Sequence, residues 1–399
     1  MNNPLLKYSA TESILGYLYQ FEIALLMLLE RPNSTVSIES IDDISFEEND
    51  KTKESIQVKH HIKNKGNVTD ASSDIWKTLN VWMDGLKELG YDDVQRILFT
   101  TETVRPNTIA YCLNRDKNKR DVSVALQKLD HTAKTSKTKE NLKIYKKFSK
   151  LRRDDKEKFV NSIFILDDNP DIKSSRNLLI EKLRTNARPG TLNPFFTRVW
   201  ETWINIVTSV LIDNTKKSIG YDEIVSHIND IRDQFTQESL PIDFVDNEPS
   251  KVEMLSFTDN DFVKQLELIS ASKPIIQIAI IEYWKAYQQR TRWVNDELLF
   301  DNELIKYEQR LINAWNKQFE KMRQKLGQNP SENDKKSLGW ELFDWADNNN
   351  SLCIRDKCIE PYVIQGSFHM LADELRIGWH SDFLTKLKSA VRTASEISK

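Results

Sequence analysis

The sequence has 399 residues, of which 39% are apolar and 29% charged, so it is long enough for two or three domains with sizeable cores. Its net charge of −3 excludes a chain that is basic throughout, and any nucleic-acid surface must therefore be local. Glycine is scarce, with 10 residues, which favours a helix-rich protein over an all-β one.

The three cysteines do not form a disulfide framework. Cys353 and Cys358 are separated by four residues, and Cys112 alone cannot complete a zinc site with them. The N-terminus lacks a signal-peptide pattern, and the longest apolar run, residues 24–29, is far below the roughly 20 residues of a membrane span. We expect a cytoplasmic protein with reduced thiols and no contact with a membrane.

The first predicted element is a helix over residues 11–30, because apolar side chains recur at helical spacing from Ile14 to Leu29 after the expected N-cap Thr11. It carries two polar side chains of interest, Gln20 and Glu22, either of which can add a polar group to a site near the helix.

Residues 41–61 predict a β-hairpin, since both arms alternate apolar and polar side chains around a polar turn at 49–51. Side chains two residues apart in a strand point the same way, so Asp43, Gln57 and Lys59 can project from one face of neighbouring strands. A carboxylate, a second oxygen ligand and an ammonium on one face can hold a divalent metal and a phosphate. The alternative is a surface hairpin whose polar face meets only water.

A capped helix from residue 74 to 86 follows, closed by Gly90, and residues 96–101 predict a buried strand. The expected order of elements is therefore helix, strand, strand, helix, strand. Further along, residues 163–168 predict a short strand, and helices are expected at 174–185, 200–212 and 221–235.

Residues 117–158 hold 15 lysines and arginines against 6 acidic residues. A solvated charged face explains such a run, and so does a surface that contacts nucleic-acid phosphates. The phosphate-contacting candidates are Lys143, Lys146, Lys147, Arg152 and Arg153. The tip of this window, residues 131–139, predicts a loop.

Residues 238–249, with two prolines and several acidic residues, predict a linker between domains. The rest is helical, with strong periodicity at 275–285 and 302–326 and another helix starting near residue 339. We expect domains at 1–240 and 250–399.

The hairpin resembles a known nuclease fold. Asp43 followed in the next strand by Gln57-x-Lys59, with Gln20 in the preceding helix, is similar to the restriction-endonuclease-like PD-(D/E)xK fold in its Mrr-like variant, which has Gln in place of Glu. More specifically, the chain resembles the dsDNA endonuclease domain of CD-NTase-associated antiphage effectors in four blocks: GYLYQFE at 16–22, SIESIDDI at 37–44, QVKHH at 57–61 and DASSDIWKTL at 70–79.

The resemblance implies catalytic roles for Asp43, Gln57, Lys59 and Gln20, with Mg²⁺ (or Mn²⁺) held by Asp43 and Gln57. Neighbouring groups that can support the site are Glu39, Asp42 and His60. Whether Asp42 or Asp43 is the main ligand stays open. We favour Asp43 because the apolar positions after it fix it to the polar face of the strand.

The second half resembles the C-terminal region of ABC-three-component (Lamassu-type) defence systems. The residues that carry this are RWVNDELL at 292–299, YEQRL at 307–311, Trp315, QGSFHMLAD at 365–373 and GWHSDF at 378–383. The resemblance implies the nuclease subunit of such a system, partnered by an SMC-like ATPase and a small third subunit. In that family the ATPase senses foreign DNA ends, and the nuclease is released or oligomerises to cut DNA.

Other constellations are weaker. His369 and His380, with acidic neighbours, do not match a common ligand spacing and favour structural roles. The chain has no GxxxxGK[ST], GxSxG or HExxH motif.

We therefore expect an α/β restriction-endonuclease-like N-terminal domain and an all-α C-terminal domain that form a Mg²⁺-dependent DNA endonuclease, active as a homo-oligomer on double-stranded DNA. The alternative functions are a non-catalytic adaptor on a nuclease fold and an RNase.

Overall fold

The computed structural model describes residues 11–39, 42–49, 51–60, 67–91, 93–213 and 217–387. The chain divides into two compact units, Met1–Arg232 (unit 1) and Asp233–Lys399 (unit 2), each of which is described by itself. The predicted layout of an α/β N-terminal part and a helical C-terminal part is confirmed.

Unit 1 is built on a six-stranded mixed sheet with the order β7-β5-β3-β2-β1-β8. Strands β3, β5 and β7 run parallel to one another, while β2 is antiparallel to β3, and β1 pairs antiparallel with β2 and β8. The strands are β1 (Thr35–Ile38), β2 (Ile44–Glu48), β3 (Lys51–Lys59), β5 (Gln95–Thr100), β7 (Ile163–Leu166) and β8 (Ile219–Gly220). A small second sheet pairs β4 (Asn67–Val68) with β6 (Thr103–Val104).

The hairpin predicted at 41–61 is confirmed as β2 and β3, although residues 41, 50 and 61 lie outside the described ranges. Asn49 in its turn takes a left-handed backbone conformation, with φ of 53°. Strand β1 was not predicted as a separate element, yet its short alternation of apolar and polar residues gives four paired positions with β2.

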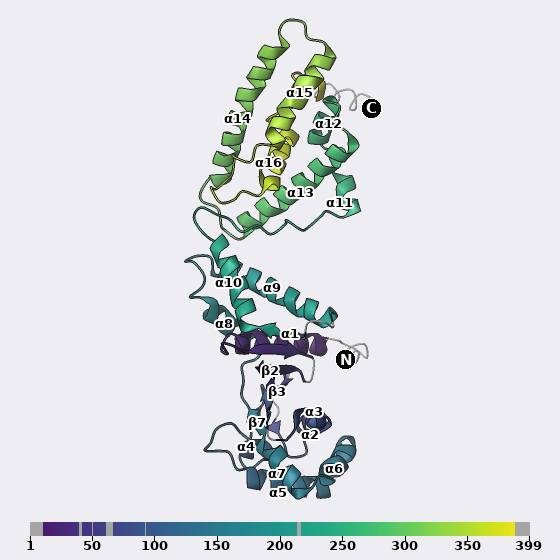
Figure 1. Ribbon diagram of the computed structural model, residues 1–399, viewed down its shortest axis with the longest axis vertical. Coiled ribbons are helices and arrows are strands. Elements are labelled where there is room, and N and C mark those ends of the chain that lie inside the picture. The colour runs from purple at the N-terminus through teal and green to yellow at the C-terminus, as the bar shows by residue number, and fades with distance from the viewer. Residues whose placement is uncertain are drawn as a thin grey trace, which may run out of the picture. The chain divides into compact units, whose positions relative to one another are not determined.

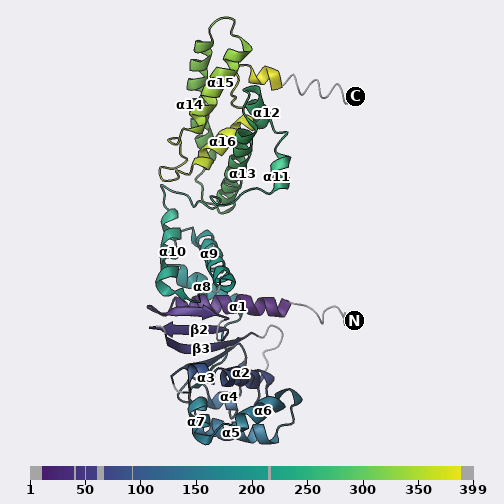
Figure 2. The same ribbon diagram turned by 45° about the vertical axis from the view of Figure 1, so that its right-hand side comes forward.

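Helices cover both faces of this sheet (Figures 1 and 2). Helix α1 (Thr11–Leu28) lies against one face, with α8 (Ile172–Leu183) and α9 (Leu192–Ile212) packed behind it. The opposite face carries α2 (Ser73–Asp84), α3 (Leu86–Leu89) and α4 (Ile109–Cys112), and α10 (Tyr221–Gln234) is the last helix that begins in the unit. Because both faces are covered, four consecutive residues of β3, Ser55 to Val58, are buried, polar ones included.

The basic window forms a helical layer beyond α2, with α5 (Val122–Thr135), a single 3-10 turn at Lys139–Asn141, α6 (Leu142–Ser149) and α7 (Arg153–Asn161). The loop predicted at 131–139 was wrong for its first half, because α5 continues to Thr135. The Asp121 carboxylate caps this helix by accepting the amide hydrogen of Val124 at 3.0 Å, and Thr132 is buried on its inner face.

The described part of unit 2 has helices and no strand. Its helices are α11 (Lys251–Ser256), α12 (Asp261–Leu268), α13 (Lys273–Asn295), α14 (Glu303–Leu326), α15 (Glu332–Asp347) and α16 (Pro361–Asp373). Helices α13 and α16 cross closely at Gly366, where a β-carbon would overlap the Glu282 carbonyl oxygen. Trp293 and Trp379 are fully buried in the surrounding core.

The segment predicted as a linker, residues 238–249, packs against unit 2. Leu240 is buried, and the Pro241 carbonyl accepts hydrogen bonds from Gln289 Nε2 at 3.1 Å and Trp293 Nε1 at 2.7 Å. These contacts fix residues 240–243 to α13. Within the described ranges, every helix is too short or too polar to span a bilayer.

Candidate active site

The end of the β2–β3 ladder brings Asp43 and Gln57 together. Ile44 pairs with Ile56, so the next pair of positions along the antiparallel ladder is Asp43 and Gln57. Gln57 Nε2 donates to Asp43 Oδ1 at 2.8 Å, and the backbone amide of Val58 donates to Asp43 Oδ2 at 2.8 Å. The Asp43 carboxylate therefore continues the hydrogen bonding of the hairpin beyond its last backbone pair.

Asp42 lies beneath this pair as a buried carboxylate. One of its oxygens accepts hydrogen bonds from Ser55 Oγ at 2.6 Å and from Trp82 Nε1 at 2.7 Å. The other accepts from Gln57 Nε2 and from the backbone amide of Asp43 at 3.2 Å. Gln57 thus donates to both carboxylates, and its amide group bridges Asp42 and Asp43.

Lys59 supplies the positive charge of this region. It lies two residues beyond Gln57 on β3 and shares its face of the sheet, where it is half-buried. Burial raises the pKa of the Asp43 carboxyl and Asp42 adds to that rise, whereas the Lys59 ammonium, the Val58 amide and Gln57 oppose it. Lys59 therefore favours the charged form of a carboxylate that is otherwise held in an unfavourable environment.

Glu39 is a third acidic side chain beside the pair. Its backbone amide donates to the Asp43 carbonyl oxygen at 3.2 Å, and its own backbone is left-handed, with φ of 54°. Burial, Asp43 and Asp42 raise the pKa of the Glu39 carboxyl, while Lys59 lowers it. Three carboxylates and one ammonium therefore influence one another at this end of the hairpin.

His60 and Glu22 lie on the other face of the sheet. The His60 ring packs 4.5 Å from the Tyr19 ring of α1, and its Nε2 accepts the backbone amide of Ile172 at 3.3 Å. Glu22 accepts a hydrogen bond from Ser175 Oγ at 2.6 Å and pairs with Arg176 at 2.9 Å. The structure does not bring these two residues to the Asp43–Gln57 face.

Gln20 is buried on α1, and its Oε1 accepts no hydrogen bond from the residues that the structure describes. No described contact joins it to Asp43, Gln57 or Lys59. Its predicted role in the site remains a prediction.

The donor set suits a cation that takes few protein ligands. Mg²⁺ binds through one or two carboxylates and keeps several waters. Asp43 offers such a carboxylate, with each oxygen using one lone pair in a hydrogen bond. Gln57 presents its amide nitrogen to Asp43, so it must rotate to offer the oxygen ligand predicted above. Among the described residues, no group of three or more His, Cys, Asp or Glu side chains is arranged to hold a metal.

Three of the five candidate phosphate contacts are in ion pairs. Lys147 Nζ lies 2.5 Å from Asp84 Oδ1 and ties α6 to α2, Arg152 pairs with Asp155 at 2.8 Å, and Arg153 pairs with Glu157 at 3.1 Å. Lys143 and Lys146 are exposed on α6 and form no ion pair with any described residue. Of the five candidates, these two lysines are the most available to a phosphate.

The histidines of unit 2 do not form a joint site. His369 Nε2 lies 3.3 Å from Glu282, and His380 Nε2 lies 3.2 Å from Glu332. Both rings are buried, in agreement with the structural roles expected for them.

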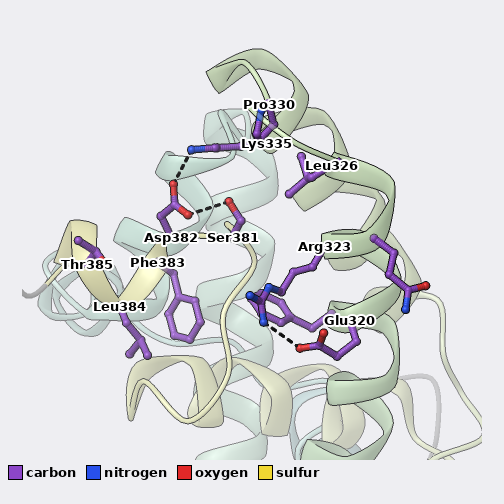
Figure 3. A pocket seen from close by; sticks show the side chains of 13 residues that line it. Glu320, Arg323, Leu326, Pro330, Lys335, Ser381, Asp382, Phe383, Leu384 and Thr385 are labelled. Carbon is purple, nitrogen blue, oxygen red and sulfur yellow. Dashed lines mark hydrogen bonds and ion pairs between the residues drawn. The ribbon is translucent and has the colours of Figure 1, made fainter.

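Unit 2 also carries a hollow of about 710 Å³ between the end of α14 and residues 381–385 (Figure 3). Charged side chains around it pair with each other, Glu320 with Arg323 at 3.2 Å and Lys335 with Asp382 at 2.7 Å. We therefore place the candidate site in unit 1 instead.

A comparison with protein families finds a match in the C-terminal part. Residues 262–387 match the family model of C-terminal domain 7 of the ABC-three component (ABC-3C) systems. The match supports the expectation that this chain is a member of an ABC-3C defence system, in agreement with the resemblance found for the second half of the sequence. No curated protein sequence matches the chain.

Two similar solved structures are of the Acinetobacter baumannii Cap4 SAVED/CARF-domain containing receptor, one of them with the cyclic trinucleotide 3'3'3'-cAAA. Both share 11% identity with this chain at a TM-score of 0.34, and they cover 70% and 69% of it. The matches span 61% and 66% of the two receptor chains.

Proposed function

We propose that this chain is the metal-dependent DNA endonuclease subunit of an antiphage or antiplasmid defence complex of Lamassu type. The observation that carries the proposal is the meeting of Asp43, Gln57 and Lys59 at the end of the β2–β3 hairpin. The order α1, β1–β3, α2, β5, with β5 parallel to β3, supports a restriction-endonuclease-like core.

Hydrolysis of a phosphodiester needs an attacking water, a proton acceptor and stabilisation of the charge that develops on the phosphate. Lys59 is the group suited to the phosphate, because its ammonium is a compact point charge at the open end of the strand. Asp43 is suited to orient the water or accept its proton, since its carboxyl is partly buried and has a raised pKa. Gln57 holds Asp43 in place through its amide group.

A divalent ion held by Asp43 would lower the pKa of a bound water and neutralise charge on the phosphate. Asp42 is less suited as the main ligand than Asp43, because four hydrogen bonds already saturate its buried carboxylate. This favours Asp43 among the two alternatives left open by the sequence.

Double-stranded DNA is the proposed substrate, and Lys143 and Lys146 are the first candidates for its phosphate contacts. Exposed ion pairs are weak, so Arg152 and Arg153 can also turn from their acidic neighbours to DNA. Contacts of this kind predict strong salt dependence and little sequence preference. Cleavage of RNA is one outcome of the test, because the site chemistry does not distinguish ribose from deoxyribose.

The partners that we propose are an SMC-like ATPase and a small third subunit, with unit 2 as the part that assembles with them. The ABC-3C match of residues 262–387 supports this assignment. Release from the complex or formation of a homo-oligomer would then switch on cleavage.

The test is incubation of the pure protein with Mg²⁺ and plasmid, with monomer and oligomer fractions assayed separately. We expect Asp43→Ala and Lys59→Ala to abolish cleavage while the far-ultraviolet circular dichroism stays that of the wild type. The matched control is Lys53→Ala, an exposed lysine on the same strand. Full cleavage by folded Lys59→Ala protein would contradict the proposal, and inert wild-type protein in every fraction would favour the adaptor.

A further inference from the structure

Trp82 is a side chain that the sequence places only in a helix core. It lies on α2, is 3% exposed, and packs in the cluster with Leu79, Met83 and Leu98. Leu98 is the cross-strand partner of Gln57, so this cluster covers the same face of the sheet as Gln57. The ring of Trp82 therefore lies directly under the candidate site.

The indole of Trp82 also donates a hydrogen bond. Its Nε1 donates to Asp42 Oδ2 at 2.7 Å, a short distance for a hydrogen bond to a carboxylate. An indole nitrogen can only donate, and close packing fixes the direction in which it does so. A hydroxyl could rotate away or accept instead, so tryptophan holds the carboxylate in one orientation.

The orientation of the Asp42 carboxylate in turn orients Gln57 and Asp43. Ser55 Oγ donates to the same Asp42 oxygen at 2.6 Å, which leaves the second oxygen directed toward Gln57 Nε2. With one amide hydrogen committed to Asp42, the other reaches Asp43 Oδ1 at 2.8 Å. Trp82, Asp42, Gln57 and Asp43 therefore form one continuous chain of hydrogen bonds from α2 to the end of the hairpin.

We infer that Trp82 is a positioning residue of the candidate site, which acts through Asp42 and Gln57 to hold the Asp43 carboxylate in the orientation in which it meets the attacking water. The inference rests on the proposed nuclease function and adds a residue that touches neither substrate nor metal. Loss of its N–H should lower the rate of the chemical step and leave DNA binding unchanged, because Trp82 is buried where α2 packs on the sheet and cannot touch DNA.

The experiment compares Trp82→Phe with Trp76→Phe in the full chain. Trp76 is a matched control, since it is buried on the same helix and its Nε1 also makes one hydrogen bond, to the Asp70 carbonyl at 2.8 Å. Plasmid cleavage at saturating Mg²⁺ gives kcat and KM. We expect Trp82→Phe to lower kcat at least roughly tenfold, the equivalent of one hydrogen bond to a charged group, with KM within about twofold. Trp76→Phe should leave both near the wild-type values.

A double-mutant cycle separates positioning from general destabilisation. If Trp82 acts through Asp42, adding Trp82→Phe to Asp42→Asn should change kcat by less than about twofold, whereas independent effects would multiply. Ser55→Ala removes the second donor to the same Asp42 oxygen without changing the aromatic core. It should reproduce the fall in kcat, and it tests the inference should Trp82→Phe fail to fold.

The outcomes are distinct. If the wild type is active and Trp82→Phe is no slower than Trp76→Phe, the inference is wrong while the proposed function stands. The same holds if the effects of Trp82→Phe and Asp42→Asn on kcat multiply. Should Trp82→Phe fail to fold, full activity of Ser55→Ala overturns the inference. A wild type that cleaves no DNA with Mg²⁺ in any fraction overturns the proposed function and this inference with it.

Discussion

Replacing Gln57 with glutamate tests the hydrogen-bonded bridge directly. Gln57 is 6% exposed, and its amide donates to the carboxylates of both Asp42 and Asp43. In the absence of a cation, an ionised glutamate can donate neither hydrogen bond, and it places a third negative charge against two others.

The magnitude follows from the two bonds that are lost. A hydrogen bond to a charged group contributes about 1.5–3 kcal/mol, so Gln57→Glu should lower the free energy of unfolding of unit 1 by about 3–6 kcal/mol without Mg²⁺. Because domains are stable by only about 5–15 kcal/mol, this loss brings unit 1 close to unfolding. A cation bound among the carboxylates reverses part of it, by about 2.7 kcal/mol at a concentration one hundred times its Kd.

Urea unfolding with and without Mg²⁺, followed by hydrogen exchange of peptides from β2 and β3, measures the change in unit 1 separately from unit 2. The control is Gln57→Met, which loses the same hydrogen bonds and adds no charge, so Mg²⁺ should stabilise it less than it stabilises Gln57→Glu. Gln57→Glu protein within about 1 kcal/mol of the wild type in the absence of divalent cations would refute the bridge.

Three further predictions concern packing, pH and salt. Gly366→Ala should lower the free energy of unfolding of unit 2 by about 1–3 kcal/mol or more in thermal unfolding, because a β-carbon there overlaps the backbone of α13, whereas Gly16→Ala, in open space on α1, should be neutral or stabilising. Burial lowers the pKa of His380, so folded unit 2 binds fewer protons than the unfolded chain, and its stability should fall as the pH drops below about 7 through the unfolded pKa of about 6.5; His380→Gln should flatten this profile, and an unchanged slope would contradict it. Changing both Lys143 and Lys146 to Gln should reduce the slope of log affinity for DNA against log salt by about 1.8 if each contacts a phosphate, and an equal slope would exclude them.

The hairpin could be predicted from the sequence because strand alternation is local. The residues around Gln57 and Lys59 alternate in a way that only a strand explains, and the structure confirms both arms and their pairing. Neighbouring residues of a strand point to opposite faces, so His60, which follows Lys59, lies on the face opposite to both Lys59 and Gln57. The sequence therefore contained the signal that His60 belongs with Tyr19 of α1 and not beside Asp43.

The positioning role of Trp82 could not be predicted from the sequence. Helical periodicity assigns it to a buried face, which is correct, but the periodicity says nothing about the partner of its N–H. That partner, Asp42, lies 40 residues away and is reached only when α2 packs on the sheet. Likewise the charge of Lys147 is visible in the sequence, whereas its pairing with Asp84 of another helix is not.

By itself, the sequence determined the order of the main elements, the helical character of the second half and the candidate residues Asp43, Gln57 and Lys59, because these depend on periodicity and residue type. Only the tertiary structure decided which carboxylate is anchored and which is half-buried beside Lys59. Two adjacent aspartates have the same local pattern, and what distinguishes Asp42 from Asp43 is the set of donors that two distant segments direct at each.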